Sequence, residues 1–383
     1  MNTFDVVIVG GGLIGASIAF ELASEKLRVG LLDSQQPGRE ASWAAAGMLS
    51  PAPESAQNTA LVPLGRASLD QYPEFVAAAE SASGKSTGYT RNGALEIFLP
   101  PSVSPERDER IALYRSLGIA AEPVSTSESA AGKAARKDSG AIWLPDEATV
   151  EPRALFEAVL ATAQQRGAKI ESGRRVIGLL LEAGRCTGVL TEEEKIGAHH
   201  VVIAAGCFST EIFSRGSRMA RYAPTRPVRG QIIAFRHGGA ALETVLRSDR
   251  GYLVPRRNGT IVAGSTSEEA GFEKRVTLEG LRKIKEAAIE LMPSLAEAQV
   301  LDSWSGLRPG TPDDLPSLGL TDTPGLLMAT GHYRNGILLA PVTAKLARGW
   351  ILGERALPID TSAFSPMRFA AEKPRAGRAT QKN

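Results

Sequence analysis

Residues 6–20 read VVIVGGGLIGASIAF. Residues 4–9 are apolar and rich in β-branched side chains, a pattern typical of a buried strand. Residues 13–23 are apolar and helix-forming, and residues 28–32 form a second β-like run. Together these segments predict a βαβ unit of about 30 residues, which begins a parallel sheet covered by helices.

Three glycines in this stretch, Gly10, Gly12 and Gly15, form the pattern G-x-G-x-x-G between the predicted strand and helix. The first makes the turn, the second lets the backbone approach a pyrophosphate, and the third lets the helix pack closely on the strand. The helix N-terminus offers N–H groups and a positive dipole end to phosphates. Asp33, at the end of the second strand, can accept hydrogen bonds from a ribose and would repel a 2′-phosphate. The pattern predicts a dinucleotide site that disfavours NADP.

Composition limits the class of protein. The 383 residues predict about two domains, and 43% hydrophobic with 22% charged residues is typical of a globular chain. A net charge of +2 gives no reason to expect nucleic acid or an anionic membrane as a partner. Residues 6–20 are too short for a membrane span. The residue that flanks them is Asp5, where a signal peptide would carry Lys or Arg. Two cysteines, Cys186 and Cys207, cannot form a disulfide framework. We therefore expect a cytoplasmic protein with no stable membrane insertion.

The predicted elements change in kind along the chain. Mixed α/β segments occur at the start, in the middle and at the end, whereas residues 228–264 alternate as antiparallel strands. Residues 308–319, RPGTPDDLPSLG, are interpreted as an irregular loop because of their Gly and Pro content. We expect residues 1–90, 147–215 and 303–360 to form a dinucleotide-binding domain, and residues 91–146 and 216–302 a substrate domain. Residues 372–383 are polar and predicted to be a disordered tail.

Several further stretches carry a family resemblance. They are ASWAAAGM (41–48), VEPRALFEAV (150–159), VVIAAG (201–206), PVRGQ (227–231), YLVPR (252–256), SGLRPGTPD (305–313) and GHYRNGILLAP (331–341). In these stretches, and in their order, the sequence resembles the FAD-dependent amino-acid and amine oxidases related to D-amino-acid oxidase. Within them it is most similar to the glycine oxidases of thiamine biosynthesis (ThiO type).

The resemblance implies a fold and a cofactor. The fold would be an α/β FAD-binding, Rossmann-like domain of the glutathione-reductase-2 type, interwoven with a smaller antiparallel-sheet substrate domain. FAD would be bound non-covalently, because relatives with a covalent flavin use a cysteine in the C-terminal region and this chain has none there. The implied cofactor-binding residues are Gly10, Gly12, Leu13, Ile14, Gly15, Asp33, Ser34, Ala41, Ser42, Ala46, Gly47, Met48, Val176, Gly206, His332, Tyr333, Arg334, Asn335, Gly336, Ile337 and Leu338.

The resemblance also implies a substrate site. Arg308 would bind a substrate carboxylate, Tyr252 would add a hydroxyl to it, and Arg334 would lie near the flavin and substrate. A guanidinium suits this role because it binds a carboxylate with two parallel hydrogen bonds. Two positions depart from the family: Arg250 stands where relatives often carry His, and Ser267 where they often carry Met. Arg250 could favour an acidic substrate or face solvent, and we favour the second interpretation.

The predicted function is oxidation of a small amino acid or secondary amine (glycine, sarcosine or a D-amino acid) to an imine or keto acid. Oxygen would be the second substrate and hydrogen peroxide a product. Only one G-x-G-x-x-G unit occurs, so the substrate itself is expected to supply the electrons. Alternatives are a dehydrogenase of the same fold that acts on amino acids or 2-hydroxy acids with a quinone or protein acceptor, a flavin-dependent tRNA-modification module, and a non-catalytic flavin-binding protein. The four histidines show no metal-ligand spacing, so no metal is expected. A homo-oligomer, dimer or tetramer, is possible.

Overall fold

The structure is a computed structural model that describes residues 3–53, 59–98, 105–125, 140–213, 218–236, 238, 242–354 and 359–369. Its first sheet has the strand order β17-β18-β11-β1-β2-β8, with β10 and β9 continuing from β11 as an antiparallel hairpin. Pairing is parallel from β18 to β8 and antiparallel between β17 and β18. The strands are β1 (Thr3–Val9), β2 (Val29–Leu32), β8 (Lys169–Glu171), β9 (Val176–Glu182), β10 (Arg185–Thr191), β11 (Lys195–Ile203), β17 (Ser317–Leu320) and β18 (Leu326–Thr330).

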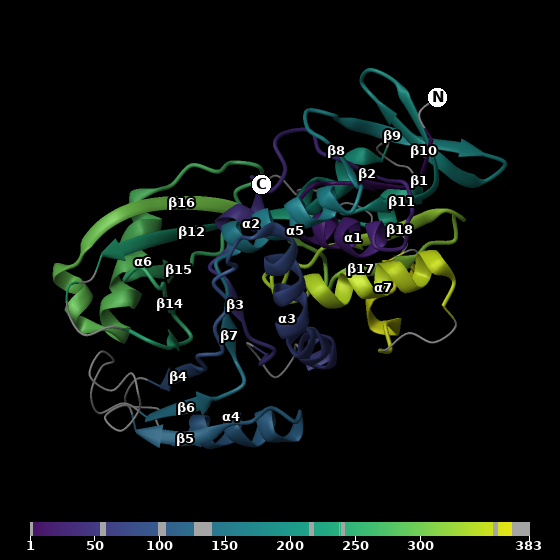
Figure 1. The fold of residues 1–383 in the computed structure, drawn as a ribbon. Coiled ribbons are helices and arrows are strands. Elements are labelled where there is room, and N and C mark those ends of the chain that lie inside the picture. The colour runs from purple at the N-terminus through teal and green to yellow at the C-terminus, as the bar shows by residue number, and fades with distance from the viewer. Residues whose placement is uncertain are drawn as a thin grey trace, which may run out of the picture.

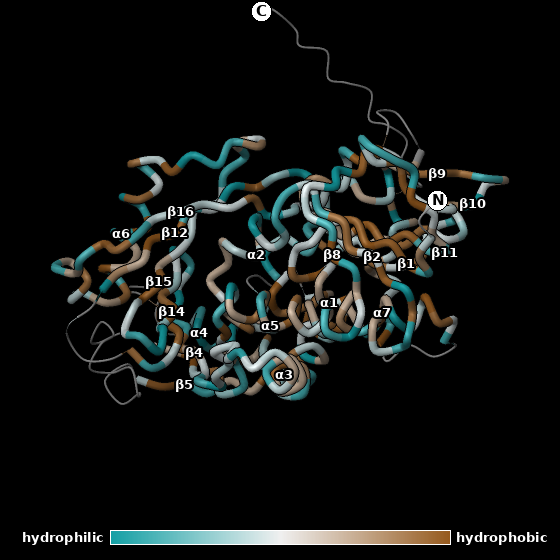
Figure 2. The backbone as a smooth tube through the Cα atoms, turned by 45° about the horizontal axis from the view of Figure 1, so that its top comes forward, coloured by the Kyte–Doolittle hydropathy of each residue, from teal (hydrophilic) through white to brown (hydrophobic). Residues whose placement is uncertain are grey.

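Both faces of this sheet are covered, which explains why residues 6–9 of β1 are apolar without alternation. Val6 and Ile8 of β1 pack into one hydrophobic cluster, and Val7 and Val9 into another on the opposite face. Figure 2 shows β1 and β2 in the brown of hydrophobic residues. Helices form the first cover (Figure 1): α1 (Leu13–Ala23), α3 (Val62–Ser83), α5 (Pro152–Gln165) and α7 (Ala340–Leu352). The β9–β10 hairpin and the 3-10 segments η2 (Gly206–Ile212) and η3 (Arg218–Tyr222) contribute to the second.

A second sheet has the order β16-β12-β15-β14-β13-β4-β6-β5. It is antiparallel except for the parallel pair β13–β4. One face packs on α6 (Leu278–Leu291), and the other packs on α4 (Pro105–Ser116) and includes Ile232 and Tyr252. The strands are β4 (Ala94–Phe98), β5 (Glu122–Ser125), β6 (Gly140–Leu144), β12 (Arg226–Arg236), β13 (Val245–Arg247), β14 (Tyr252–Pro255), β15 (Thr260–Gly264) and β16 (Gln299–Gly310).

Short elements connect the two sheets. Helix α2 (Ala41–Ala44) lies between them in Figure 1, and β3 (Met48–Leu49) pairs with β7 (Ala148–Thr149). The remaining 3-10 turns are η1 (Thr59–Leu61), η4 (Pro293–Glu297), η5 (Ser362–Phe364) and η6 (Pro366–Phe369). Among the residues that the structure describes, no helix combines the length and apolar character needed to cross a bilayer.

The predicted fold class is confirmed, with one local correction. The segment 308–319 is not wholly irregular, because β16 pairs with β12 as far as Gly310 and β17 begins at Ser317. Pro309 is tolerated because β16 ends the strand order of its sheet, where a missing N–H leaves no unpaired partner. The proposed domain division stays a prediction. Its boundary at residue 303 falls inside β16, all of which belongs to the second sheet, and the tail 372–383 lies outside the described residues.

Candidate active site

One cavity, with a volume of about 1520 Å³, is lined by residues of both sheets. It is larger than the roughly 300–1,000 Å³ of a typical single-ligand pocket, so it has room for a dinucleotide and a second small molecule. Every residue predicted for the cofactor and the substrate lines this cavity except Gly15. Residues that the sequence placed far apart therefore lie around one space.

The three glycines at the start of α1 have different structural roles. Gly10 has a φ of +107°, and a Cβ there would lie 2.5 Å from the carbonyl oxygen of Ala204. Gly15 faces the turn, and a Cβ on it would come 2.0 Å from the carbonyl oxygen of Gly10. Gly15 is therefore a packing residue that lets α1 lie against the turn, as its place in the motif predicts. Gly12 lines the cavity directly at the N-terminus of the helix.

The N-terminus of α1 suits an anion. Its first turn carries no acidic residue, and Gly12 caps it without a side-chain hydrogen bond. The backbone N–H of Leu13 donates to Ser42 Oγ at 2.8 Å, which ties α2 to this helix end. Partly unpaired N–H groups and the positive end of the helix dipole favour a phosphate at such a position.

Asp33 is held at the carboxyl end of β2 by two backbone donors. Its Oδ2 accepts from the N–H of Gly11 and its Oδ1 from the N–H of Gln35, both at 2.8 Å. Each carboxylate oxygen has a further lone pair, so these bonds orient the group and leave capacity for a ligand hydroxyl. Asp33 lines the cavity beside Ser34, as a ribose-binding role requires, and that role stays a prediction.

Residues 46–48 form a turn whose support was not predicted. Gly47 has a φ of +84°, and a Cβ there would lie 2.1 Å from the carbonyl oxygen of Val150. Arg256 donates from Nη2 to the carbonyl oxygen of Ala46 at 2.6 Å and from Nη1 to that of Val150 at 3.1 Å. This arginine, the last residue of YLVPR, therefore fixes the turn from the second sheet.

The GHYRNG turn enters α7 and lines the cavity from residue 332 to 339. Its backbone is held from outside: Tyr72 Oη donates to the carbonyl oxygen of Ile337 at 2.5 Å, and Ser68 Oγ donates to that of Leu338 at 2.6 Å. Tyr333 adopts a φ of +48°, and its N–H donates to the carbonyl oxygen of Pro309 at 3.0 Å. This last bond joins the turn to the end of β16, which carries Arg308.

His332 in this turn is neutral. It is buried, its Nε2 lies 3.0 Å from Thr343 Oγ1, and burial lowers its pKa to about 3. His332 lines the cavity, and its predicted position beside the cofactor stays a prediction. An imidazole with this pKa carries no charge in the neutral pH range and exchanges no proton there.

Arg308 and Tyr252 converge from opposite sides on neighbouring residues. The Arg308 side chain starts from β16 and crosses β12 at Gly230, where a Cβ would lie 2.2 Å from Nη1. Its Nη2 then donates to Ser265 Oγ at 2.7 Å. Tyr252 leans from β14 over Gly264, where a Cβ would lie 2.4 Å from its hydroxyl. Two glycines, Gly230 and Gly264, thus make room for both groups on the cavity side of the sheet.

Arg334 and the two positions that depart from the family, Arg250 and Ser267, lie away from this convergence point. Arg334 lines the cavity and is exposed. Ser267 Oγ lies 3.4 Å from Tyr333 Oη. Arg250 lies at the cavity edge, is half-exposed and forms an ion pair with Glu290. The preferred interpretation of Arg250 as a solvent-facing residue agrees with this placement.

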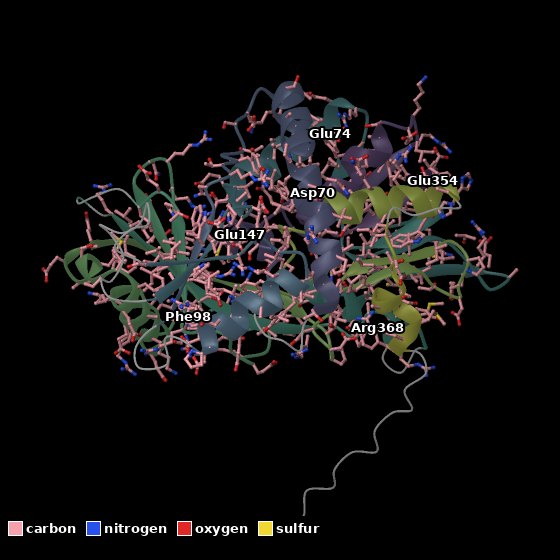
Figure 3. The ribbon with its side chains drawn as sticks, turned by 90° about the horizontal axis from the view of Figure 1, so that it is seen from below. Asp70, Glu74, Phe98, Glu147, Glu354 and Arg368 are labelled. Atoms are coloured by element: carbon pink, nitrogen blue, oxygen red, sulfur yellow. The ribbon has the colours of Figure 1, made fainter. Side chains whose placement is uncertain are left out.

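A buried ionic cluster next to Tyr252 was missed. Arg247, opposite Tyr252 in the β13–β14 pair, forms ion pairs with Glu96 at 2.9 Å and Glu147 at 3.0 Å. Tyr114 Oη donates to Glu96 Oε2 at 2.6 Å. Burial raises the pKa of Glu147, while Arg247 acts against that rise. Figure 3 places Glu147 among the side chains in the middle of the molecule. The members of this cluster come from two strands, helix α4 and a turn, so no local sequence pattern could have revealed it.

Comparison with known proteins agrees with this geometry. A family model described as FAD dependent oxidoreductase matches residues 5–350. The glycine oxidase of Pseudomonas putida is 32% identical over 94% of this chain and 98% of its own length. The bifunctional protein ThiO/ThiG of Synechocystis sp. is 36% identical over 96% of this chain and 54% of its own length. The chain thus spans about half the length of that relative.

The fold comparison gives the same result. The crystal structure of glycine oxidase from Geobacillus kaustophilus superposes with a TM-score of 0.89 and 30% identity. The alignment covers 96% of this chain and 99% of that one. The crystal structure of iminodiacetate oxidase from Chelativorans sp. superposes with a TM-score of 0.84 and 25% identity, over 94% and 98% of the two chains.

Proposed function

Because the chain belongs to the family of FAD-dependent oxidoreductases, we propose that it oxidises the C–N bond of a small amino acid or secondary amine with release of hydrogen peroxide. The candidate substrates are glycine, sarcosine and D-amino acids, all of which carry a carboxylate beside the amine. One observation carries the proposal: the Arg308 guanidinium and the Tyr252 phenol converge in the same cavity that the G-x-G-x-x-G turn lines.

The residues that line the cavity fit FAD. The N-terminus of α1 would hold the pyrophosphate, Asp33 the ribose, and the 332–338 turn the isoalloxazine ring. The turn suits a flavin because a backbone entering a helix aims N–H groups at an electron-rich ring. When bound, FAD supplies the two-electron oxidation by accepting a hydride equivalent from the substrate carbon.

Arg308 and Tyr252 orient the substrate. The guanidinium would bind the carboxylate with two hydrogen bonds, and the Tyr252 hydroxyl would add a third from the other side. Both side chains are fixed before the substrate arrives, Arg308 by Ser265 and Tyr252 by burial against β15. Prior fixation lowers the entropy cost of reaching the reactive geometry, which is the main contribution that these residues make.

No side chain needs to remove a proton from the substrate carbon if the amine arrives uncharged. His332 is the histidine of the turn at residues 331–336, and its pKa of about 3 leaves it neutral but very weakly basic. The reaction rate should then follow deprotonation of the substrate ammonium in solution. The resulting imine would be hydrolysed by water to the keto acid and ammonia, or to the keto acid and a primary amine where the substrate is a secondary amine.

The imine itself could be the useful product. The bifunctional ThiO/ThiG relative and the ThiO-type sequence resemblance support a place in thiamine biosynthesis. In that case the imine would be passed to a following enzyme before water hydrolyses it.

An oxygen-electrode assay tests the proposed function. FAD-loaded protein is given glycine, sarcosine, D-alanine or hydroxyproline, with oxygen uptake and peroxide measured together. We expect peroxide equal to the oxygen consumed for at least one amine. Substrate oxidation that proceeds only with an added quinone or dye would favour the dehydrogenase alternative and contradict the oxidase assignment.

A further inference from the structure

Arg308 is oriented by two acceptors in the segment that follows β15. Its Nη2 donates to Ser265 Oγ at 2.7 Å, and its Nη1 donates to the carbonyl oxygen of Thr266 at 3.0 Å. Neither acceptor carries a negative charge, so these two bonds orient the guanidinium without neutralising its positive charge. Ser265 lines the same cavity as Arg308.

The segment 265–268 is anchored independently of the Ser265 side chain. Arg229 and Glu268 exchange two backbone hydrogen bonds of 2.9 and 3.0 Å, and their side chains form an ion pair. Gln231 donates from Nε2 to Glu268 Oε1 at 2.6 Å and from its backbone N–H to Thr266 Oγ1 at 2.9 Å. Removing the Ser265 hydroxyl would therefore leave the segment in place.

We propose that Ser265 is a positioning residue that holds Arg308 in the orientation that binds the substrate carboxylate. The inference rests on the proposed function only where it takes Arg308 as the carboxylate-binding group. With Ser265 present, the guanidinium is held at both terminal nitrogens before the ligand arrives. Without its hydroxyl, Nη2 loses this acceptor while the bond from Nη1 to Thr266 remains, so the orientation of the guanidinium is less restricted. Ligand binding must then order the side chain, which weakens affinity but not the reaction of bound substrate.

The proposal predicts which kinetic constant changes. Ser265→Ala should raise KM for the amine about tenfold, the scale of one hydrogen bond to a charged group, and leave kcat within about twofold. Ser265→Thr keeps a hydroxyl and should restore most of the affinity. Ser303→Ala is the matched control: Ser303 lies on β16, the strand of Arg308, and does not line the cavity. It should bind and react as the wild type does.

A binding measurement without turnover separates this proposal from the proposed function. Titration calorimetry of FAD-loaded protein with acetate, a carboxylate that cannot be oxidised at an amine, compares wild type, Ser265→Ala, Arg308→Ala and the double variant. We expect about tenfold weaker acetate binding by Ser265→Ala. Removing the hydroxyl from Arg308→Ala should cause no further loss, because Ser265 acts through Arg308.

The outcomes distinguish the positioning role of Ser265 from direct contact with the carboxylate and from failure of the proposed function. Additive losses in the double variant would mean that Ser265 touches the carboxylate itself, and they would overturn the positioning role. Acetate binding and KM of Ser265→Ala within twofold of the wild type would also overturn it. If the wild type oxidises no amine but binds acetate with the expected pattern, the positioning role stands and the proposed function fails. If the wild type neither binds acetate nor oxidises an amine, both fail.

Discussion

Replacing Gly230 by alanine should impair substrate binding without unfolding the protein. A Cβ at this position would lie 2.2 Å from Nη1, 2.3 Å from Nη2 and 2.4 Å from Cζ of Arg308, whereas ordinary contact begins at 3.4 Å. The guanidinium must therefore move by about 1 Å, and a misplacement of that size can cost about 100-fold in rate. Loss of one hydrogen bond to a charged group costs about 1.5–3 kcal/mol, which corresponds to about a 10- to 100-fold loss of affinity. We expect kcat/KM to fall within that range, mainly through KM.

The assay is steady-state oxidation of the best amine, combined with thermal unfolding of the same samples. The backbone of Gly230 is not in the left-handed region, and the displaced atoms are the end of a flexible side chain, so the melting temperature should hardly change. Gly178→Ala is the control, because this glycine lies in a strand with nothing within 4 Å of its added Cβ. Wild-type KM in a folded Gly230→Ala protein would refute the assignment of Arg308 to the carboxylate.

Further predictions concern Arg308, the Arg247 cluster, the pH dependence of the rate and His332. Arg308→Ala should raise KM by two or more orders of magnitude, on the scale of ~3 kcal/mol, and unchanged kinetics would refute its role. Arg247→Ala leaves Glu96 and Glu147 buried without the arginine that pairs with both. Urea unfolding should show that the free energy of unfolding falls by about 3–5 kcal/mol. A fall below about 1 kcal/mol would contradict a stabilising role for the ionic cluster. The rate should rise from about pH 6 to about pH 10 as the substrate ammonium deprotonates, and a flat profile would contradict oxidation of the neutral amine. His332 has a folded-state pKa of about 3 against an ordinary 6.5, so as the pH falls from 6.5 towards 3 the unfolded chain binds the proton first and stability is lost. His332→Gln should reduce this pH dependence of the free energy of unfolding, measured by urea unfolding of the apoprotein. The same pH dependence in the variant and the wild type would contradict the lowered pKa of His332.

The start of the chain could be predicted closely from sequence. Helix α1 spans Leu13–Ala23 as expected, because a continuous apolar run between a glycine motif and a charged turn leaves little choice of boundaries. At Gly10, Gly15 and Gly47 a Cβ would collide with a backbone carbonyl oxygen, so these motif positions have a local steric reason, while the cofactor-binding roles stay predictions. Gly15, the one predicted site residue that does not line the cavity, serves the motif by packing.

Other features depend on contacts between distant segments. Strand pairing at Pro309 depends on the position of β16 in its sheet, which composition does not reveal. Arg247 resembles any surface arginine in sequence, and only folding brings Glu96 and Glu147 to it. Ser265 becomes important because Arg308 reaches it across β12. A prediction from local pattern cannot find such partners, since each bond joins residues far apart along the chain.

The central claim is that Arg308 holds a carboxylated amine against the flavin. Anaerobic mixing of the FAD-loaded protein with glycine, sarcosine or a D-amino acid tests it, with the absorbance of oxidised flavin followed over time. We predict that at least one amine bleaches the wild type, that the Arg308→Ala protein bleaches far more slowly at the same amine concentration, and that admitted oxygen restores the colour. Equal bleaching of the two proteins, or no bleaching of the wild type by any of these amines, would contradict the claim.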